Sequence, residues 1–264
     1  MARPIIAFLS DFGLRDHYVG AMKGAALAVC PDATLVDLTH EIPPQDITAA
    51  AYELAAAAGY FPVETVFVAV VDPGVGGSRR GIAAEADGRR FVGPDNGLFT
   101  LIVSGAGSVR AVEITSPRHQ RPAISRTFEG RDRFAPAAAW LAAGVPLGEL
   151  GPDVSNLVTL DLPVPVTRGR TIVGCVIRVD RFGNAITNIA ASAVASLPAD
   201  LVVHAGDVEI AGLVPSYAHA AHGAPCALIG SSGHLEVALN GGSAAKTLRL
   251  ERGAVVQVRP RAGA

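Results

Sequence analysis

IIAFLSD at residues 5–11 and VFVAVVD at residues 66–72 are two runs that are apolar almost throughout and end in an aspartate. Neither run alternates between apolar and polar residues. Continuously apolar strands are typical of the centre of a parallel sheet, because helices cover both faces of such a sheet. In open sheets of this kind, ligands bind beyond the carboxyl ends of the strands. We therefore expect two central strands whose carboxylates, Asp11 and Asp72, share one crevice.

Strand and helix patterns alternate up to about residue 160. The β-rich runs cover residues 4–11, 34–39, 65–72 and 109–115. Helical patterns cover residues 16–30, 46–58 and 134–143. This alternation predicts an α/β domain with a largely parallel central sheet over residues 1–162.

Residues 161–170 carry Pro163, Pro165 and Gly169, and the helical signal disappears after them. Short strand patterns follow at residues 171–179, 185–189, 201–204, 225–229, 234–239 and 254–259. Many short strands between Gly, Asp and Pro turns are typical of a small barrel or sandwich. We expect a smaller, all-β, barrel-like domain over residues 170–264.

Charge and composition argue against several classes of partner. The chain has 22 basic and 24 acidic residues, a net charge of −2 and no run of like charges, so neither nucleic acid nor a membrane surface is expected to bind it. The first apolar stretch is short and stops at Asp11, and no stretch is long enough to span a bilayer. Three widely spaced cysteines and scattered histidines predict neither disulfides nor a metal site. A soluble cytoplasmic protein is the expectation.

Polar clusters follow the predicted strands and turns, at residues 10–13, 72–80, 127–132 and 180–184. The glycines at residues 74–77 lack the Gly-Lys-Ser/Thr ending of a phosphate loop. The turn after the first strand is richer in acids than in glycines, and carboxylates repel phosphate. They suit ribose hydroxyls or a cation instead, so the pattern favours a nucleoside without phosphates.

Several of these residues have a second, purely structural interpretation. Arg79 and Arg80 are either solvated or turned inward toward Asp72. Asp132, beside Arg131, is expected to pair with it and to cap the following helix.

The turn that contains Phe182 and Asn184 is a candidate adenine site, because an aromatic face can stack on the base while a carboxamide binds its edge. A simple turn is the alternative. The sequence around these two residues leaves both interpretations open.

Taken together, six segments resemble the S-adenosylmethionine (SAM) hydroxide adenosyltransferase family, relatives of the chlorinase and fluorinase enzymes. They occur in the same order over essentially the whole chain: IIAFLSDFG at 5–13, VDPGVG at 71–76, GPDNGL at 93–98, TFEGRD at 127–132, DRFGNAITN at 180–188 and GSSGHLE at 230–236. The resemblance implies an α/β domain, a C-terminal β-barrel, and a homotrimer. It also implies active sites between the N-terminal domain of one subunit and the C-terminal domain of its neighbour.

The same resemblance implies roles for residues in the substrate site. Asp11 would hold the ribose hydroxyls, Phe182 and Asn184 the adenine, and Asp180 with Ser231 the amino and carboxylate ends of the methionine part. SAM would be the substrate, adenosine and methionine the products, and no cofactor or metal would be needed.

The attacking water would be positioned by Asp72, Arg79 and the residue at position 129. Hydroxide-directed relatives read Thr-Phe-His-Gly-Arg-Asp where this chain has Glu129. A glutamate there either accepts the water proton as a general base or pairs with Arg79 or Arg131. We expect a slower hydrolase whose rate rises as a carboxylate deprotonates, and a gain in turnover on Glu129→His.

Two alternatives stay open from the sequence. One is a halide-using relative that makes 5′-chloro-5′-deoxyadenosine, although such relatives lack the acid at the Asp72 position and Glu129 adds negative charge where chloride would bind. The other is a SAM-binding protein without catalysis. Product formation in the presence and absence of chloride distinguishes all three.

Overall fold

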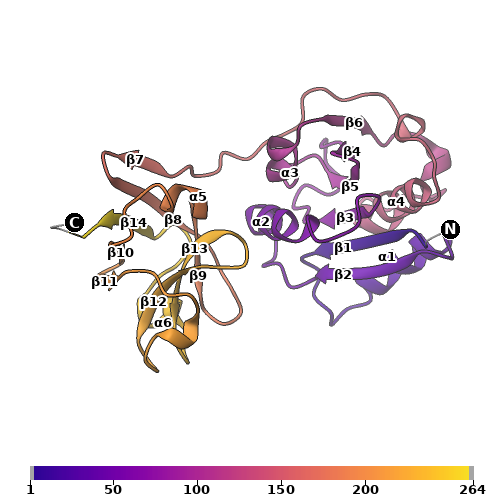
Figure 1. Ribbon diagram of the computed structural model, residues 1–264. Coiled ribbons are helices and arrows are strands. Elements are labelled where there is room, and N and C mark those ends of the chain that lie inside the picture. The colour runs from indigo at the N-terminus through magenta and orange to yellow at the C-terminus, as the bar shows by residue number, and fades with distance from the viewer. Residues whose placement is uncertain (1–2, 262–264) are drawn as a thin grey trace. The chain divides into compact units, whose positions relative to one another are not determined.

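The computed structural model describes residues 3–261. The chain divides into two compact units, Met1–Leu160 and Asp161–Ala264. The first unit is an α/β layer structure and the second is an antiparallel β structure (Figure 1). The predicted fold class is confirmed.

The first unit is built on a six-stranded sheet in the order β2-β1-β3-β5-β4-β6. Its strands are β1 (Ile5–Ser10), β2 (Thr34–Thr39), β3 (Val66–Val70), β4 (Gly81–Ala86), β5 (Arg89–Pro94) and β6 (Val109–Glu113). The pairs β1–β2, β1–β3 and β3–β5 are parallel, and β4 pairs antiparallel with both β5 and β6. The sheet is thus parallel over the part that carries the two predicted central strands.

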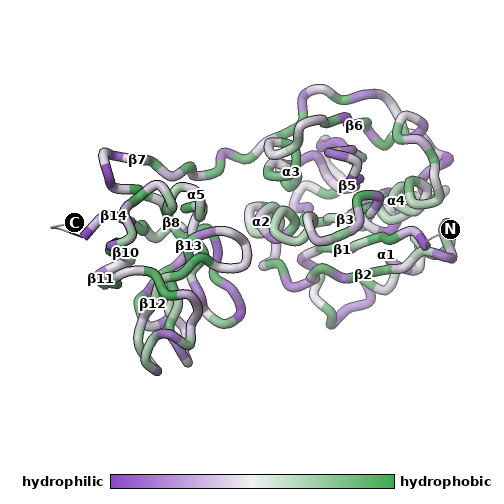
Figure 2. The backbone as a smooth tube through the Cα atoms, in the orientation of Figure 1, coloured by the Kyte–Doolittle hydropathy of each residue, from purple (hydrophilic) through white to green (hydrophobic). Residues whose placement is uncertain are grey.

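Both faces of β1 and β3 are buried, as their apolar sequences predict. Ile6 and Phe8 pack on one face, in the core that contains α1 (Tyr18–Leu27) and α4 (Ala135–Ala142). Ala7 and Leu9 pack on the other, with α2 (Ile47–Ala58) and α3 (Thr100–Gly105). Figure 2 shows β1 as a hydrophobic, green segment. The core therefore fixes the carboxyl ends of these strands, where the polar side chains begin.

The sequence interpretation missed the hairpin of β4 and β5. These strands are joined at Asp87 and Gly88, which have φ angles of 48° and 80°. Positive φ at both central residues is the geometry of a tight hairpin turn, for which Asp-Gly is a preferred pair. The alanine-rich strand β4 hid this signal, because alanine has little preference for strands.

The second unit is an eight-stranded antiparallel sheet, with seven strands in the order β11-β10-β14-β8-β9-β13-β12 and β7 paired to β8. Its strands are β7 (Val166–Arg168), β8 (Thr171–Val179), β9 (Ala185–Ala190), β10 (Leu201–Ala205), β11 (Val208–Ala211), β12 (Pro225–Ile229), β13 (His234–Leu239) and β14 (Val255–Pro260). The two end strands, β11 and β12, contact each other, so the sheet nearly closes into a barrel. Its interior is apolar, with Val176, Ile189 and Val237 fully buried.

Short helical segments complete the described chain. They are η1 (Pro117–His119), η2 (Gly130–Phe134), η3 (Leu147–Leu150), α5 (Ala191–Val194), η4 (Tyr217–His219) and α6 (Ala244–Thr247). Of these, η2 is a π-helical turn that leads directly into α4. Within residues 3–261, no helix has the length and apolar character that crossing a membrane requires.

Candidate functional site

The loop after β3 folds back on itself and brings Arg79 against Asp72. The reversal runs through Gly76, whose φ is +73° and where a Cβ would lie 2.2 Å from the carbonyl oxygen of Arg126. Only glycine fits so close an approach at this φ. Arg79 Nε donates to both carboxylate oxygens of Asp72, at 3.0 and 3.1 Å, and its Nη2 forms an ion pair with Asp72 Oδ2. The prediction that at least one of the two arginines turns inward is confirmed.

Glu129 accepts a hydrogen bond from Arg79 on the opposite side of the guanidinium. The distance from Arg79 Nη1 to Glu129 Oε2 is 2.8 Å. The side chains are nearly buried, with exposed fractions of 5% for Asp72, 11% for Arg79 and 7% for Glu129. Burial lowers the pKa of Arg79, but hydrogen bonds and negative charge from Asp72 and Glu129 outweigh it and raise the pKa overall. The structure thus assembles Asp72, Arg79 and Glu129 into one cluster with a permanently charged centre.

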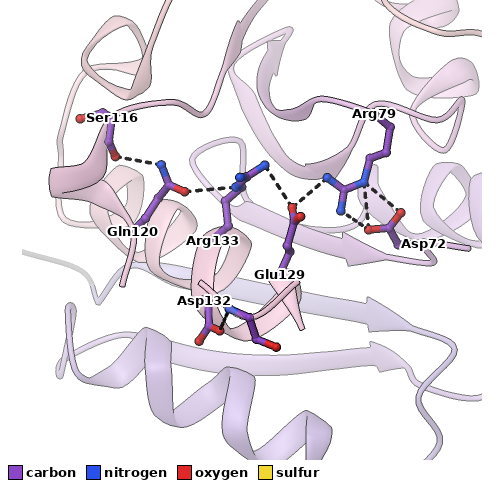
Figure 3. Close-up of polar contacts among 8 residues, drawn as sticks. Asp72, Arg79, Ser116, Gln120, Glu129, Asp132 and Arg133 are labelled. Atoms are coloured by element: carbon purple, nitrogen blue, oxygen red, sulfur yellow. Dashed lines mark hydrogen bonds and ion pairs between the residues drawn. The ribbon is translucent and has the colours of Figure 1, made fainter. Parts of the chain in front are cut away.

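A further arginine extends this cluster. Arg133 Nη1 lies 3.1 Å from Glu129 Oε2, and Arg133 Nε donates to Gln120 Oε1 at 3.1 Å. Gln120 Nε2 in turn donates to the carbonyl of Ser116 at 3.1 Å. Figure 3 shows these side chains as a continuous row from Ser116 to Asp72. The sequence interpretation named Arg79 or Arg131 as the partner of Glu129. Arg79 is confirmed, and the second arginine is Arg133 rather than Arg131.

Asp132 does not cap the helix, so that prediction is wrong. The chain enters α4 through the π-helical turn η2, and Asp132 lies inside this turn rather than before it. Its carboxylate accepts the backbone N–H of Ser125 at 2.8 Å and pairs with Arg131 at 2.6 Å. Burial raises the pKa of Asp132, but these hydrogen bonds and the charges of Arg131 and Arg121 lower it overall. The predicted ion pair with Arg131 is confirmed.

Asp11 lies in the turn after β1, beside the end of β3. Ser10 is opposite Val70 in the parallel register, so Asp11 and Asp72 follow neighbouring strands at the same edge of the sheet. Asp11 Oδ2 accepts the backbone N–H of Gln45 at 2.8 Å.

A partly buried network that the sequence analysis missed stabilises this turn. Ser10 Oγ lies 2.7 Å from His40 Nδ1, and His40 Nε2 lies 2.9 Å from Asp37 Oδ1. Lys23 Nζ donates to Asp37 Oδ2 at 2.6 Å. Ser10 and His40 are 0% and 3% exposed, so they serve to fix the Asp11 turn from inside rather than to contact a ligand.

In the second unit, a cavity of about 620 Å³ contains the other four predicted residues, Asp180, Phe182, Asn184 and Ser231. Phe182 is 78% exposed, which is unusual for a large aromatic residue and leaves its ring available for stacking.

Asp180 organises the turn in this cavity. Its Oδ1 accepts the backbone N–H groups of Phe182 and Asn184 at 2.9 and 2.8 Å, and its Oδ2 accepts Asn184 Nδ2 at 2.9 Å. The side-chain amide of Asn184 is thereby oriented, with its nitrogen turned to Asp180. Its oxygen is the atom left to accept a hydrogen bond from a ligand.

Tyr217 and Glu236 also line this cavity, and the sequence interpretation missed both. Tyr217 Oη donates to Glu236 Oε1 at 2.5 Å, and Glu236 is 5% exposed. Burial, this hydrogen bond and the negative charges of Glu236 and Asp180 raise the pKa of Tyr217 well above its usual range. A glutamate inside the otherwise apolar strand pattern of β13 was the available signal, because a buried carboxylate requires a partner.

Comparison with known proteins identifies the family of this chain. Family profiles for the SAM hydroxide adenosyltransferase N-terminal and C-terminal domains match residues 6–151 and 174–257. The chain belongs to the SAM hydroxide adenosyltransferase family.

Individual relatives span nearly the whole chain. An (R)-S-adenosyl-L-methionine hydrolase from Thermus thermophilus is 44% identical, over 97% of this chain and 99% of that protein. A fluorinase from Nocardia brasiliensis is 31% identical, over 97% of each. The crystal structure of an uncharacterised conserved protein from Thermotoga maritima superimposes with a TM-score of 0.92 at 35% identity, covering 97% of this chain and 100% of the other.

As a SAM hydroxide adenosyltransferase, the chain carries its predicted residues in two groups. Asp11, Asp72, Arg79 and Glu129 are in the α/β unit, and the cavity residues are in the β unit. Within residues 3–261, no group of three or more His, Cys, Asp or Glu side chains has an arrangement that could hold a metal ion.

Proposed function

We propose that this protein hydrolyses SAM to adenosine and L-methionine by attack of water on the C5′ carbon of the ribose. Relatives at 37–44% identity over nearly the full chain are named (R)-S-adenosyl-L-methionine hydrolases. The observation that carries the proposal is the buried Asp72–Arg79–Glu129 cluster at the carboxyl edge of the parallel sheet. The names of these relatives specify the R epimer of SAM, and we propose that this protein also acts on the epimer with the R configuration at sulfur.

The chemistry asks little of the protein beyond positioning. The sulfonium is already an excellent leaving group, so the site must align a water oxygen opposite the sulfur and exclude competing solvent. Arg79 would stabilise the developing hydroxide, and Asp72 would orient Arg79 and the water. The reaction joins the water oxygen to C5′, breaks the bond from C5′ to sulfur, leaves the electron pair on the methionine thioether, and releases one proton of the water. The proposed reaction uses no cofactor.

The remaining residues would bind the substrate. Asp11 would accept hydrogen bonds from the ribose hydroxyls, and the exposed ring of Phe182 would stack on adenine while Asn184 binds its edge. Asp180 and Ser231 would hold the amino and carboxylate ends of the methionine part. Three of the hydrogen bonds that Asp180 can accept are already used within its own turn, which supports a role in shaping the pocket as well as in binding.

We further propose a cytoplasmic homotrimer in which each active site combines the α/β unit of one subunit with the β unit of its neighbour. The division of the candidate residues between two units supports shared sites, as does the exposed aromatic ring of Phe182.

Subunit complementation tests this arrangement. Asp72→Asn and Asn184→Ala would each inactivate the homotrimer. Co-expression of the two variants should restore part of the activity if a site draws on two subunits, because some mixed interfaces then combine two intact units. An inactive mixed assembly, with light scattering confirming that it is mixed, would refute shared sites.

The arrangement around Arg79 disfavours a halide-using enzyme. Three of its N–H groups already face two carboxylates, and a chloride would have to approach a buried pair of negative charges. The deciding experiment incubates the protein with each sulfur epimer of SAM, with and without excess chloride, and separates the nucleosides by chromatography. Adenosine alone supports the proposal. A chlorinated nucleoside selects the halogenase, and binding without turnover selects the non-catalytic alternative.

A further inference from the structure

Arg133 is a second positively charged side chain that contacts Glu129, and it has no role in the proposed mechanism. Its Nη1 lies 3.1 Å from Glu129 Oε2, the same oxygen that accepts Arg79 Nη1 at 2.8 Å. Across residues 3–261, no hydrogen bond or ion pair reaches the other oxygen, Oε1. The two guanidiniums therefore hold one carboxylate oxygen and leave its neighbour for another partner.

Two residues, Gln120 and Gly81, determine the position of the Arg133 side chain. Gln120 accepts its Nε–H at 3.1 Å, and the amide of Gln120 is oriented by the Ser116 carbonyl. Gly81, at the start of β4, leaves the space through which the side chain passes. A Cβ there would lie 2.9 Å from Arg133 Cδ and 3.2 Å from its Nη1. The glycine and the glutamine together direct this guanidinium at Glu129.

Charge balance gives Arg133 a chemical consequence. Asp72 and Glu129 are two nearly buried carboxylates, and with Arg79 alone the cluster would carry a net negative charge. Arg133 brings the cluster to neutrality, whereas Arg131 pairs with a different carboxylate. Because an uncompensated buried charge is costly, removing Arg133 would favour the protonated form of Glu129. A protonated carboxyl cannot accept the proton of an attacking water.

We propose that Arg133 is a positioning residue for the hydrolysis, which holds Glu129 Oε2 so that the ionised carboxylate presents Oε1 to the attacking water. The inference rests on the proposed function. In the step that it supports, the water proton passes to Glu129 Oε1 as the oxygen bonds to C5′. The electron pair of the breaking bond stays on sulfur, and Glu129 later releases the proton to solvent.

The test measures adenosine formation by Arg133→Met from acid to alkaline pH. The value of kcat at neutral pH should fall at least about tenfold, and by no more than the 10²–10⁴-fold that a general base contributes in full. The acid limb of the plot of kcat against pH should move to higher pH, while KM changes little. Arg133→Lys keeps the positive charge, so its acid limb should lie close to that of the wild type. A purely structural role would leave the acid limb where it is.

A double-mutant comparison isolates the route through Glu129. Adding Arg133→Met to Glu129→Gln should cause no further loss, because the titrating group is already absent. Arg110→Met is the matched control, since Arg110 pairs with Asp153 at the surface and should change neither profile. An unshifted acid limb, or an undiminished loss in the Glu129→Gln background, would overturn the inference.

Two further experiments separate a failure of the inference from misfolding of the variant and from a failure of the proposed function. If Arg133→Met does not fold, Gln120→Leu removes only the acceptor of Arg133 Nε and should shift the limb by a smaller amount in the same direction. An unshifted limb in that variant would also overturn the inference. Wild-type protein that forms no adenosine would instead refute the proposed function, before any variant is compared.

Discussion

Replacing Arg79 with methionine removes the cation that two buried carboxylates share. The Arg79 side chain is 11% exposed, and its guanidinium carbon also lies 5.4 Å from the centre of the Phe134 ring. Breaking a buried ion pair costs about 3–5 kcal/mol, because a charge is left without its partner. At roughly 2–4 °C per kcal/mol for a unit of this size, the unfolding temperature should fall by about 6–20 °C. Adenosine formation should fall about 10²–10³-fold, as expected for loss of a stabilising cation.

The pH dependence of this deficit has a definite sign. The pKa of Arg79 is raised, so the guanidinium remains charged wherever the protein is folded. In the variant, Asp72 loses its arginine and Glu129 keeps only Arg133, so a buried negative charge is left uncompensated wherever both carboxylates are ionised. The deficit should therefore be smallest in acid and grow as the pH rises and the carboxyl groups ionise.

Thermal unfolding at acidic and neutral pH, beside Arg110→Met, provides the assay. The Arg110 and Asp153 side chains are 58% and 70% exposed, and a surface pair of this kind contributes at most about 1 kcal/mol. If Arg79→Met melts at the same temperature as the Arg110 control, or becomes relatively more stable as the pH rises, Asp72 and Glu129 do not depend on a shared buried cation.

Three further predictions concern other parts of the sites. His40→Ala should destabilise the protein by about 1–3 kcal/mol, measured by chemical denaturation, because the buried Ser10 hydroxyl loses its hydrogen-bond partner. Tyr217→Phe should weaken SAM binding, as a higher dissociation constant in calorimetry. The variant removes the hydroxyl that donates a hydrogen bond to Glu236, and the carboxylate of Glu236 is then free to reorient. Glu129→His, which the sequence suggested would raise turnover, now places an imidazole before two guanidiniums. We expect the gain to appear in the Glu129→His, Arg133→Met double variant and not in the single one, as steady-state kinetics will show.

Much of the first unit follows from its sequence because its central strands are apolar on both faces. That pattern identified β1 and β3, and their terminal residues Asp11 and Asp72 fall at one edge of the sheet. The strand β4 was not predicted because its alanines are typical of helix sequence, although the Asp87-Gly88 pair is a signal for a hairpin turn.

The side-chain partners were harder to predict than the strands. A sequence shows that Glu129 and Arg133 are four residues apart, but not that a π-helical turn connects them or that Gly81 makes room for the arginine. The capping role expected of Asp132 failed for the same reason, since the turn shifted the start of the helix beyond it. The contact between Tyr217 and Glu236 spans 19 residues and depends on how the barrel closes.

The site of water attack is tested by running the reaction in water enriched in ¹⁸O and analysing both products by mass spectrometry. Attack of water on C5′ predicts one ¹⁸O atom in adenosine, at the 5′ hydroxyl, and none in methionine, with no exchange into added adenosine. Adenosine without the label, or label in methionine, would contradict attack of water on C5′.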